Sequence, residues 1–195
     1  MTDFYNFKNC KSDIQSIVHV INLLGTDLVG AEIGVFKAES FCTILQNCPN
    51  IKTLYGIDSY KPYTDYLKEP YDGTPAYTIT QKEIEYIKLT AHHNIQWSGF
   101  VEKAILFEKD SSLALKHFQD SSLDFIFLDT CMTYEQAKKD IEEWFPKVKP
   151  GKLVAGHDWD SSAVQRAVKE YRKENNITSS ISTFDNTWCW IKNEA

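Results

Sequence analysis

The sequence predicts an α/β fold in which a doubly wound, mostly parallel sheet carries helices on both of its faces. Segments with strand-like and helix-like patterns of apolar residues alternate along most of the chain, which is the order typical of such sheets. Residues 123–129 (LDFIFLD) form a nearly continuous apolar run, as expected for a strand buried on both faces of a parallel sheet. The chain has 195 residues, enough to bury the core of one domain, and we expect a single domain over residues 1–195.

The first third of the chain predicts a helix, a strand, a second helix and a second strand. Residues 13–24 place apolar side chains at helical spacing, inside an N-terminal helical segment expected over residues 1–26. The elements that follow are a strand over residues 28–34, a helix over residues 38–48 and a strand over residues 53–58.

The connection after the second strand is unusually long. Most connections in α/β units have roughly two to six residues, whereas about forty residues separate this strand from the next one. We therefore expect residues 60–98 to form a lid or acceptor-binding insertion. A helix in its second half carries His92 and His93, which we interpret as a solvated pair.

The remaining sequence continues the alternation and supplies five more strands. We expect the segment KPG, residues 149–151, to end a helix and to separate it from the next strand. The predicted elements are strands over residues 103–110, 123–129, 152–158, 179–184 and 187–192, and helices over residues 112–118, 133–148 and 162–176.

Composition excludes several classes of protein. The 21 Lys and Arg residues against 27 Asp and Glu residues give a net charge of −6, which argues against a general nucleic-acid or anionic-membrane binder. The five cysteines include no CxxC pair, so we expect reduced thiols rather than a disulfide framework or a zinc knuckle. No apolar run approaches the roughly 20 residues of a membrane span, and the first residues lack the apolar centre of a signal peptide. We therefore expect a cytoplasmic protein.

Acidic residues stand at the ends of most predicted strands. Ligands of doubly wound sheets bind outside the carboxyl ends of the strands. A single Asp at such a point is usually a turn former or a helix cap, but repetition at nearly every strand end favours a ligand site. These positions are Glu32 with Gly34, Asp58, Asp110, Asp129, and His157 with Asp158.

The turn after the first strand argues against a dinucleotide ligand. A dinucleotide-binding turn has three glycines spaced GxGxxG, so that a diphosphate can approach the backbone. The segment AEIGVFKAES has only Gly34 there, and it has Glu32 two residues earlier. A carboxylate would repel a diphosphate and favours a ligand with a positive charge or with sugar hydroxyls.

Four segments in this order carry a family resemblance. GAEIGVFKAES, LYGIDSY, EKDSS and the run from Leu123 to Val168, which contains LDTCMTYEQAKKDI, KPG and GHD, resemble the class I S-adenosylmethionine-dependent methyltransferases. The similarity is greatest to their small-molecule and glycan O-methyltransferase branch, and it covers roughly residues 28–192. It implies a Rossmann-like, seven-stranded sheet, S-adenosylmethionine as cofactor, and methyl transfer to a hydroxyl of a small molecule or glycan building block.

The resemblance also assigns the cofactor-binding residues. Asp58 would accept hydrogen bonds from the ribose hydroxyls, Asp110 and Ser111 would lie beside the adenine, and Asp129 would lie near the methyl group and the methionine amine. The full set implied is Glu32, Gly34, Val35, Phe36, Ser40, Asp58, Ser59, Asp110, Ser111 and Asp129.

Three residues at the ends of the fourth and fifth strands are the catalytic candidates. His157 is the candidate base, because the unperturbed pKa of histidine, roughly 6.5, lies close to working pH. Asp129 and Asp158 face it. Alternatively these two carboxylates would bind Mg²⁺, as in related methyltransferases, although no third protein ligand is apparent. A histidine bonded to a backbone carbonyl in the core is the structural alternative for His157.

Aromatic residues are the candidates for acceptor binding. Tyrosines cluster with prolines at the start of the 60–98 insertion, and flat rings with a polar edge suit a sugar or aromatic acceptor. The alternative is that they pack a lid or a contact between two copies in a homodimer. The assigned substrate residues are Tyr60, Tyr63, Tyr66 and Trp159.

Two departures from the family pattern leave a second function open. Ala38 replaces a glycine of the first turn, which we expect to be tolerated. Cys131 and Met132 replace the usual Asp-His pair after the fourth strand. The alternative to a methyltransferase is therefore a protein that binds S-adenosylmethionine or S-adenosylhomocysteine without transferring the methyl group, or an enzyme that consumes the cofactor in another way.

Overall fold

A computed structural model of the protein describes residues 14–65, 77–130 and 133–193. Its helices are α1 (Gln15–Asn22), α2 (Glu39–Asn47), α3 (Gln81–Ser98), α4 (Ser111–Ala114), α5 (Tyr134–Trp144) and α6 (Ser162–Glu174), with 3-10 turns η2 (Val101–Lys103), η3 (Leu115–His117) and η4 (Phe145–Lys147). Its strands are β1 (Leu28–Ile33), β2 (Ile51–Asp58), β3 (Tyr63–Asp65), β4 (Tyr77–Ile79), β5 (Ala104–Glu108), β6 (Leu123–Leu128), β7 (Val148–Gly156), β8 (Ser182–Phe184) and β9 (Thr187–Ile191).

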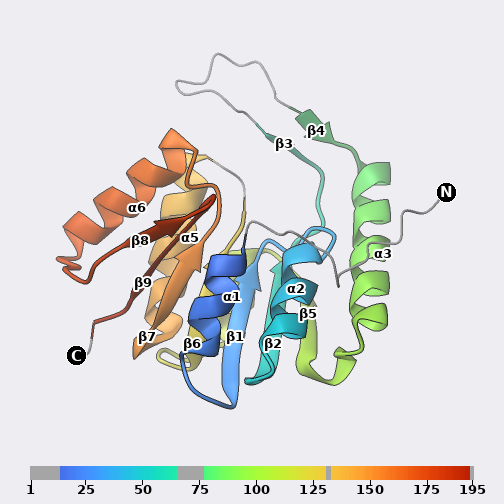
Figure 1. The fold of residues 1–195 in the computed structure, drawn as a ribbon. Coiled ribbons are helices and arrows are strands. Elements are labelled where there is room, and N and C mark those ends of the chain that lie inside the picture. Colours follow the sequence, from blue (N-terminus) through green and yellow to red (C-terminus); the bar gives the residue numbers. More distant parts are fainter. Residues whose placement is uncertain (1–13, 66–76, 131–132, 194–195) are drawn as a thin grey trace.

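Seven of the strands form one sheet in the order β5-β2-β1-β6-β7-β9-β8 (Figure 1). The first five strands in this order are parallel to one another, and β9 and β8 add an antiparallel edge. The predicted α/β fold with a mostly parallel, doubly wound sheet is confirmed. The strand order reverses between β1 and β6, and ligands of such sheets bind at this switch point.

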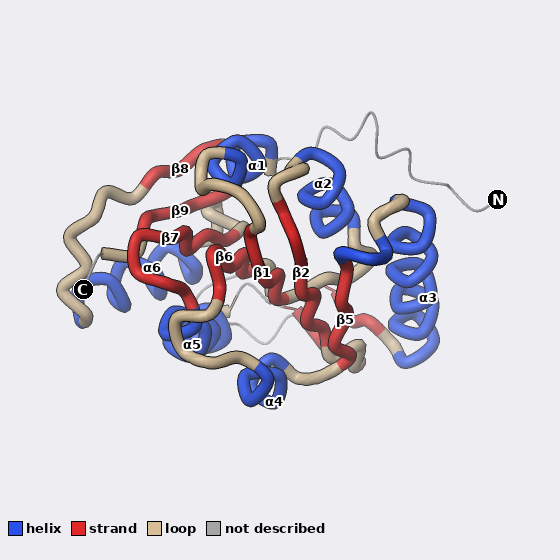
Figure 2. The backbone as a smooth tube through the Cα atoms, turned by 90° about the horizontal axis from the view of Figure 1, so that it is seen from below, coloured by secondary structure: helices blue, strands red, loops and turns tan. Residues whose placement is uncertain are grey.

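The two faces of the sheet are covered by different helices. Figure 2 shows α1, α2 and α3 on one side of the strands and α4, α5 and α6 on the other. Strand β6 is buried along its whole length, and its side chains alternate between the two sides. Phe125 and Phe127 belong to the core under α1–α3, whereas Ile126 and Leu128 belong to the core under α4–α6. This two-sided burial explains the unbroken apolar run in the sequence.

The KPG segment does not end the helix before β7, and that prediction was wrong. Pro150 and Gly151 lie inside β7. In the pairing of β7 with β6, Leu123 lies opposite Val148 and Phe125 lies opposite Leu153, so the register shifts between these two pairs. Such an irregular stretch tolerates a proline, because no ladder hydrogen bond is required of its nitrogen. Gly151 provides the positive φ of 73° that the extra residues need.

The long connection between β2 and β5 contains both a hairpin and a regular helix. Strands β3 and β4 pair in antiparallel fashion and rise above the carboxyl ends of the sheet strands (Figure 1). Helix α3 begins at a capping box formed by Thr80 and Glu83, and its buried residues, among them Ile84 and Ile87, join the core beneath α1 and α2. In this helix His92 contacts Glu108 at 2.7 Å.

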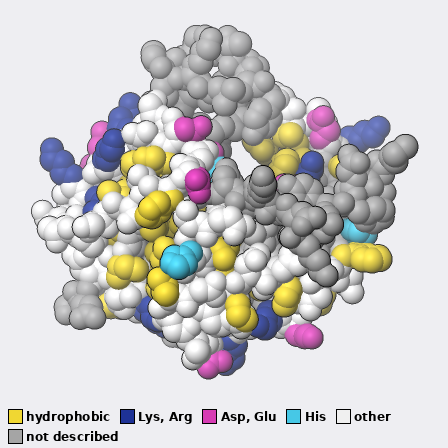
Figure 3. Space-filling model, in the orientation of Figure 1, with side chains coloured by type: hydrophobic (Ala, Val, Ile, Leu, Met, Phe, Trp, Pro, Cys, Tyr) yellow, Lys and Arg dark blue, Asp and Glu magenta, His cyan; other side chains and the backbone are white. Residues whose placement is uncertain are grey.

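The surface carries charges of both signs. Figure 3 shows Lys and Arg side chains interspersed with Asp and Glu on one face of the molecule, together with scattered hydrophobic groups. Within the described part of the chain, no helix combines the length and the apolar character needed to cross a membrane.

Gly34 and Gly99 both have a positive φ, but the atoms around them differ. Gly34 has φ +90° and Gly99 has φ +83°, but a Cβ at Gly34 would lie 2.0 Å from the carbonyl oxygen of Asp129, whereas no described atom lies within 4 Å of one at Gly99. Gly99→Ala should therefore lower the free energy of unfolding only through backbone strain, by about 1 kcal/mol. Gly34→Ala should cost about 3 kcal/mol or more, because the end of β6 must also move. Urea denaturation of both variants measures the difference. Equal losses of unfolding free energy would contradict the close contact between Gly34 and Asp129.

Candidate active site at the carboxyl ends of the strands

The ends of four neighbouring strands bring the predicted site residues together. Ile33 at the end of β1 lies opposite Leu128 of β6, and Leu128 lies opposite Gly156 of β7. On the other side of β1, Glu32 lies opposite Gly56, two residues before the end of β2. The residues that follow these strands are therefore neighbours at one edge of the sheet, as the family resemblance implies.

Glu32 is a fully buried carboxylate inside β1. Its side chain is 0% exposed, and its Oε1 accepts a hydrogen bond from Ser40 Oγ of α2. Its Oε2 is buried and has no hydrogen-bond partner among the described residues. Burial raises the pKa of Glu32 well above its ordinary value, and the nearby Asp129 and Asp58 raise it further, while Ser40 and His157 lower it. An unpartnered buried acceptor of this kind is costly unless a ligand supplies a donor.

Asp58 holds the turn between β1 and α2. Its Oδ2 accepts hydrogen bonds from the amides of Val35 at 3.0 Å and Phe36 at 2.9 Å, and its Oδ1 accepts from the amide of Tyr60 at 2.8 Å. A carboxylate oxygen can accept two hydrogen bonds, so Oδ1 keeps one further acceptor site. Asp58 thus shapes the turn, and its assignment to the ribose remains a prediction for which Oδ1 is the suitable atom.

The turn that Asp58 holds contains two non-glycine residues with positive φ. They are Phe36 at 49° and Ala38 at 62°. Ala38 is fully buried at the start of α2, so it adopts the left-handed conformation that a glycine would adopt more easily. Ala38, which stands where the family pattern has a glycine, thus occupies a position whose backbone adopts the left-handed conformation.

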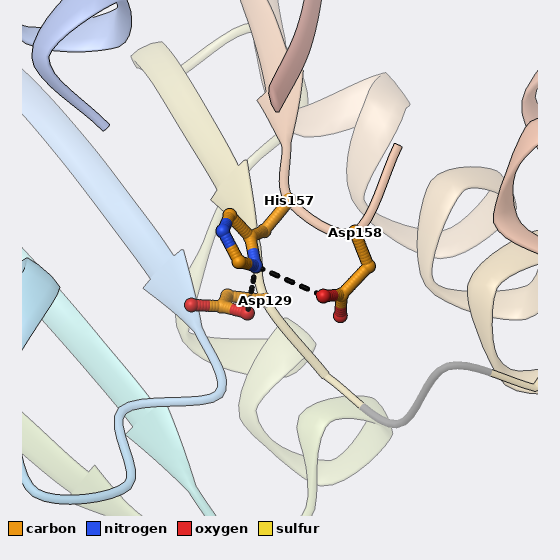
Figure 4. Close-up of side chains that lie close together, drawn as sticks. All are labelled: Asp129, His157 and Asp158. Carbon is orange, nitrogen blue, oxygen red and sulfur yellow. Dashed lines mark ion pairs between the residues drawn. The ribbon is translucent and has the colours of Figure 1, made fainter. Parts of the chain in front are cut away.

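His157 lies between two carboxylates (Figure 4). Its Nδ1 is 3.0 Å from Asp158 Oδ1 and 3.5 Å from Asp129 Oδ1. Asp129 follows β6 and the other two residues follow β7, and all three side chains are 17–28% exposed. Because a carboxylate accepts hydrogen bonds, this contact favours the tautomer with the proton on Nδ1 and leaves Nε2 as the basic nitrogen.

The same three side chains form a potential metal site. One ligand atom from each of them lies within 4.8 Å of the other two. His157 is thus the candidate for the third protein ligand that the sequence did not reveal. Two carboxylate oxygens suit Mg²⁺, and the imidazole nitrogen would also suit a transition metal.

Asp110, in the loop after β5, and Ser111, the first residue of α4, lie at the same edge. Asp110 caps α4, and its Oδ1 accepts from the amide of Ser112 at 3.2 Å. The hydroxyl of Ser111 donates to Asp140 Oδ1 at 2.9 Å, so the backbone rather than the hydroxyl of Ser111 is available to a ligand. The assignment of both residues to the adenine remains a prediction.

Three of the four residues assigned to the acceptor lie in described parts of the chain, and they belong to different segments. Tyr60 is 7% exposed, and its hydroxyl donates to the carbonyl of Phe36 at 3.1 Å, which makes it a core residue beneath the turn. Tyr63 lies in β3. Trp159 is partly buried against the α4–α6 core, and Lys169 of α6 lies 5.4 Å from the centre of its ring. Tyr66 lies outside the described residues, as do Cys131 and Met132.

A small cavity lies directly beside His157 and Asp158. Its lining includes Thr130, Asp140 and Trp188. Asp140 is fully buried, and burial raises its pKa above the ordinary value, whereas hydrogen bonds from Gln136, Thr130 and Ser111 lower it. Sequence reasoning gave Asp140 no role, although its position in the YEQAKKDI segment was the available signal.

The middle of the chain matches a known family. The model described as "Methyltransferase domain" matches residues 31–159, about two thirds of the chain. A curated protein of Sinorhizobium fredii (strain NBRC 101917 / NGR234), "Uncharacterized protein y4gI", is 36% identical over 66 residues, which are 34% of this chain and 7% of that protein. The chain therefore spans only a small part of that relative's length.

Solved methyltransferases share the fold. The O-methyltransferase NovP superposes with a TM-score of 0.66 at 19% identity, over 97% of this chain and 78% of that chain. TomG from Streptomyces achromogenes, an O-methyltransferase solved with SAM, gives a TM-score of 0.63 at 12% identity, over 94% of this chain and 82% of that chain. The family match shows that the chain belongs to the methyltransferase domain family, and these solved structures share its fold.

Proposed function

We propose that the protein transfers a methyl group from S-adenosylmethionine to a hydroxyl of a small molecule or glycan building block. The observation that carries this proposal is the set of groups at the switch point of the sheet. A buried acceptor without a partner, Glu32 Oε2, suits an ammonium donor, and a histidine between two carboxylates lies at the neighbouring strand ends. The fold of methyltransferases solved with SAM supports the choice of cofactor.

The residues at the strand ends fit the parts of this cofactor. Glu32 Oε2 would accept from the methionine amine, Asp58 Oδ1 from a ribose hydroxyl, and the backbone beside Asp110 would face the adenine. When bound, the cofactor supplies an electrophilic methyl group on a sulfonium. The protein then has to hold the acceptor in line with that methyl group, and correct alignment can account for much of the acceleration.

His157 has the geometry of a base for the acceptor hydroxyl. With Nδ1 held by Asp158, Nε2 can take the proton as the oxygen attacks the methyl group. Asp129 and Asp158 stabilise the imidazolium that results. A divalent cation at the same three side chains is the other route, because it lowers the pKa of a bound hydroxyl.

Binding and transfer are tested separately. Calorimetric titration with S-adenosylhomocysteine tests the cofactor site, and transfer of a labelled methyl group to a screen of sugar nucleotides, phenols and amines tests the reaction. Binding and transfer to a hydroxyl support the proposal. Binding without transfer to any acceptor would favour the alternative of a cofactor-binding protein, and absence of binding would overturn both.

Asp58→Ala should weaken binding of S-adenosylhomocysteine by at least about tenfold, because the variant loses hydrogen bonds to a charged acceptor worth roughly 1.5–3 kcal/mol each. Asp120→Ala is the control, since Asp120 is an exposed carboxylate paired with Lys147 and belongs to no strand end of the site. A 2′-deoxy analogue of S-adenosylhomocysteine shows whether binding weakens because a contact with the ribose is lost or because the turn held by Asp58 is disturbed. If Asp58 contacts the 2′-hydroxyl, the analogue binds the wild type more weakly than the parent compound does, but it binds the variant equally well.

A further inference from the structure

A charged side chain in the core needs a reason, and Asp140 is such a residue. It lies in α5, 0% exposed, where a carboxylate costs free energy unless several donors satisfy it. Three side chains donate hydrogen bonds to the Asp140 carboxylate. Ser111 Oγ donates to Oδ1 at 2.9 Å, while Thr130 Oγ1 at 2.7 Å and Gln136 Nε2 at 2.8 Å donate to Oδ2.

The positions of two of these donors connect Asp140 with the proposed site. Ser111, the first residue of α4, directly follows Asp110, and Thr130 directly follows Asp129 after β6. The Asp140 carboxylate therefore joins the loop assigned to the adenine with the strand end assigned to the methyl group. A second contact, from Ser112 Oγ to Glu143 Oε2 at 2.7 Å, joins α4 with α5 but does not reach Thr130.

We propose that Asp140 is a positioning residue that holds the Asp110–Ser111 loop and the Asp129–Thr130 strand end at a fixed separation for cofactor binding. It acts through Ser111 and Thr130, because its buried carboxylate accepts hydrogen bonds from both of their hydroxyls. Free Ser111 and Thr130 hydroxyls could rotate, whereas a shared acceptor fixes both at once. This inference rests on the proposed function only for the identity of the ligand, since the link between the two segments is a property of the protein alone.

Three substitutions separate positioning from a merely structural role. Asp140→Leu keeps the approximate size and removes the acceptor, which leaves the donors of Ser111, Thr130 and Gln136 without their shared partner and should lower stability. Asp140→Asn can still accept from Thr130 and Gln136 through its oxygen, and its amide can donate to Ser111 Oγ, because a hydroxyl also accepts. Glu143→Ala removes the neighbouring contact alone and is the matched control.

Amide hydrogen exchange without ligand is the first measurement. In folded Asp140→Leu protein, exchange in the segments around Ser111 and Thr130 should be faster by about tenfold or more. This change should exceed the change in strands remote from Asp140, because a general loss of stability speeds exchange throughout the protein. Asp140→Asn should return exchange toward the wild-type rate, and Glu143→Ala should leave exchange at Thr130 unchanged. Unchanged exchange in a folded Asp140→Leu protein would overturn the proposal.

Calorimetry with S-adenosylhomocysteine is the second measurement. Asp140→Leu should weaken binding by about tenfold or more, and Asp140→Asn should recover most of the loss. Ser111→Ala and Thr130→Val each remove one donor, and each should weaken binding by about three- to tenfold, so the proposal stays testable if Asp140→Leu does not fold. Adding Ser111→Ala to Asp140→Leu should cause no further loss, because both act through one contact; additive losses would contradict this.

The two measurements distinguish the two proposals. If the wild type does not bind S-adenosylhomocysteine, the proposed function fails, and hydrogen exchange still decides whether Asp140 holds the two segments. If the wild type binds it and Asp140→Leu binds it equally well, Asp140 is structural only, whatever the exchange rates.

Discussion

His157→Ala should lower the rate of methyl transfer by about 10²- to 10⁴-fold and leave the affinity for S-adenosylhomocysteine nearly unchanged. This is the range that a positioned general base contributes, and a loss in turnover without a loss in binding identifies a group that acts in the transition state. The contact of Nδ1 with Asp158 at 3.0 Å orients the ring for that role. Turnover of the acceptor found in the screen, with binding measured by calorimetry, checks this prediction.

A matched histidine provides the control for this variant. His92 also contacts a carboxylate, Glu108, at 2.7 Å, but it lies on α3, away from the three catalytic candidates. His92→Ala should therefore keep full activity. If chelator abolishes activity and Mg²⁺ restores it, the metal route applies, and Asp129→Asn and Asp158→Asn should then both be inactive. Full turnover by His157→Ala without a metal requirement would contradict both routes.

Glu32→Gln should weaken binding of S-adenosylhomocysteine by about ten- to a hundredfold, yet make the unliganded protein more stable. A hydrogen bond from an ammonium to a carboxylate is worth roughly 1.5–3 kcal/mol, and the neutral amide loses this charge assistance. The same change removes a buried charge whose Oε2 has no partner among the described residues, while the amide oxygen can still accept from Ser40. A site that binds a cation at the expense of stability behaves in this way.

The pH dependence of stability gives the sign of this effect. Burial raises the pKa of Glu32 in the folded protein, so the folded state holds the proton more tightly than the unfolded state does. The contribution of Glu32 to the free energy of unfolding is therefore complete below the pKa of the unfolded chain and is lost as the pH rises through the folded pKa. The stability gained in Glu32→Gln should disappear below about pH 4, the ordinary range of a glutamate pKa, and should grow as the pH rises above it.

Urea denaturation across this pH range measures the difference between the two proteins. Glu102→Gln changes an exposed glutamate of η2 and should alter neither stability nor affinity. A Glu32→Gln protein that is less stable than the wild type at pH 7 would show that the carboxylate is satisfied without a ligand.

The sequence predicted the sheet and the edge that carries the site, because both depend on local patterns. An apolar run such as residues 123–129 must be buried on both sides, and parallel strands place the residues after their carboxyl ends together. This is why Asp129, His157 and Asp158 meet as expected. The KPG segment could not be predicted in the same way, because the bulge that accommodates Pro150 depends on its pairing with β6.

The buried partners of the site depend on tertiary contacts that no spacing rule reveals. Asp140 receives donors from residues 10 and 29 positions away in the chain, and the buried Tyr60 donates to the carbonyl of Phe36, 24 positions away. The role of Asp58 in holding the turn after β1 likewise follows from amides 22 and 23 positions away. Contacts between residues so far apart in the chain can be assigned only from the folded structure.

A crystal structure with S-adenosylhomocysteine bound tests the central claim most directly. The ligand should lie across the carboxyl ends of β1, β2 and β6, with its amine on Glu32 Oε2 and its sulfur facing His157. An acceptor oxygen in line with a methyl group on that sulfur should then lie within hydrogen-bond reach of Nε2. A ligand bound elsewhere, or a His157 ring more than about 8 Å from the methyl position and therefore beyond that reach, would contradict it.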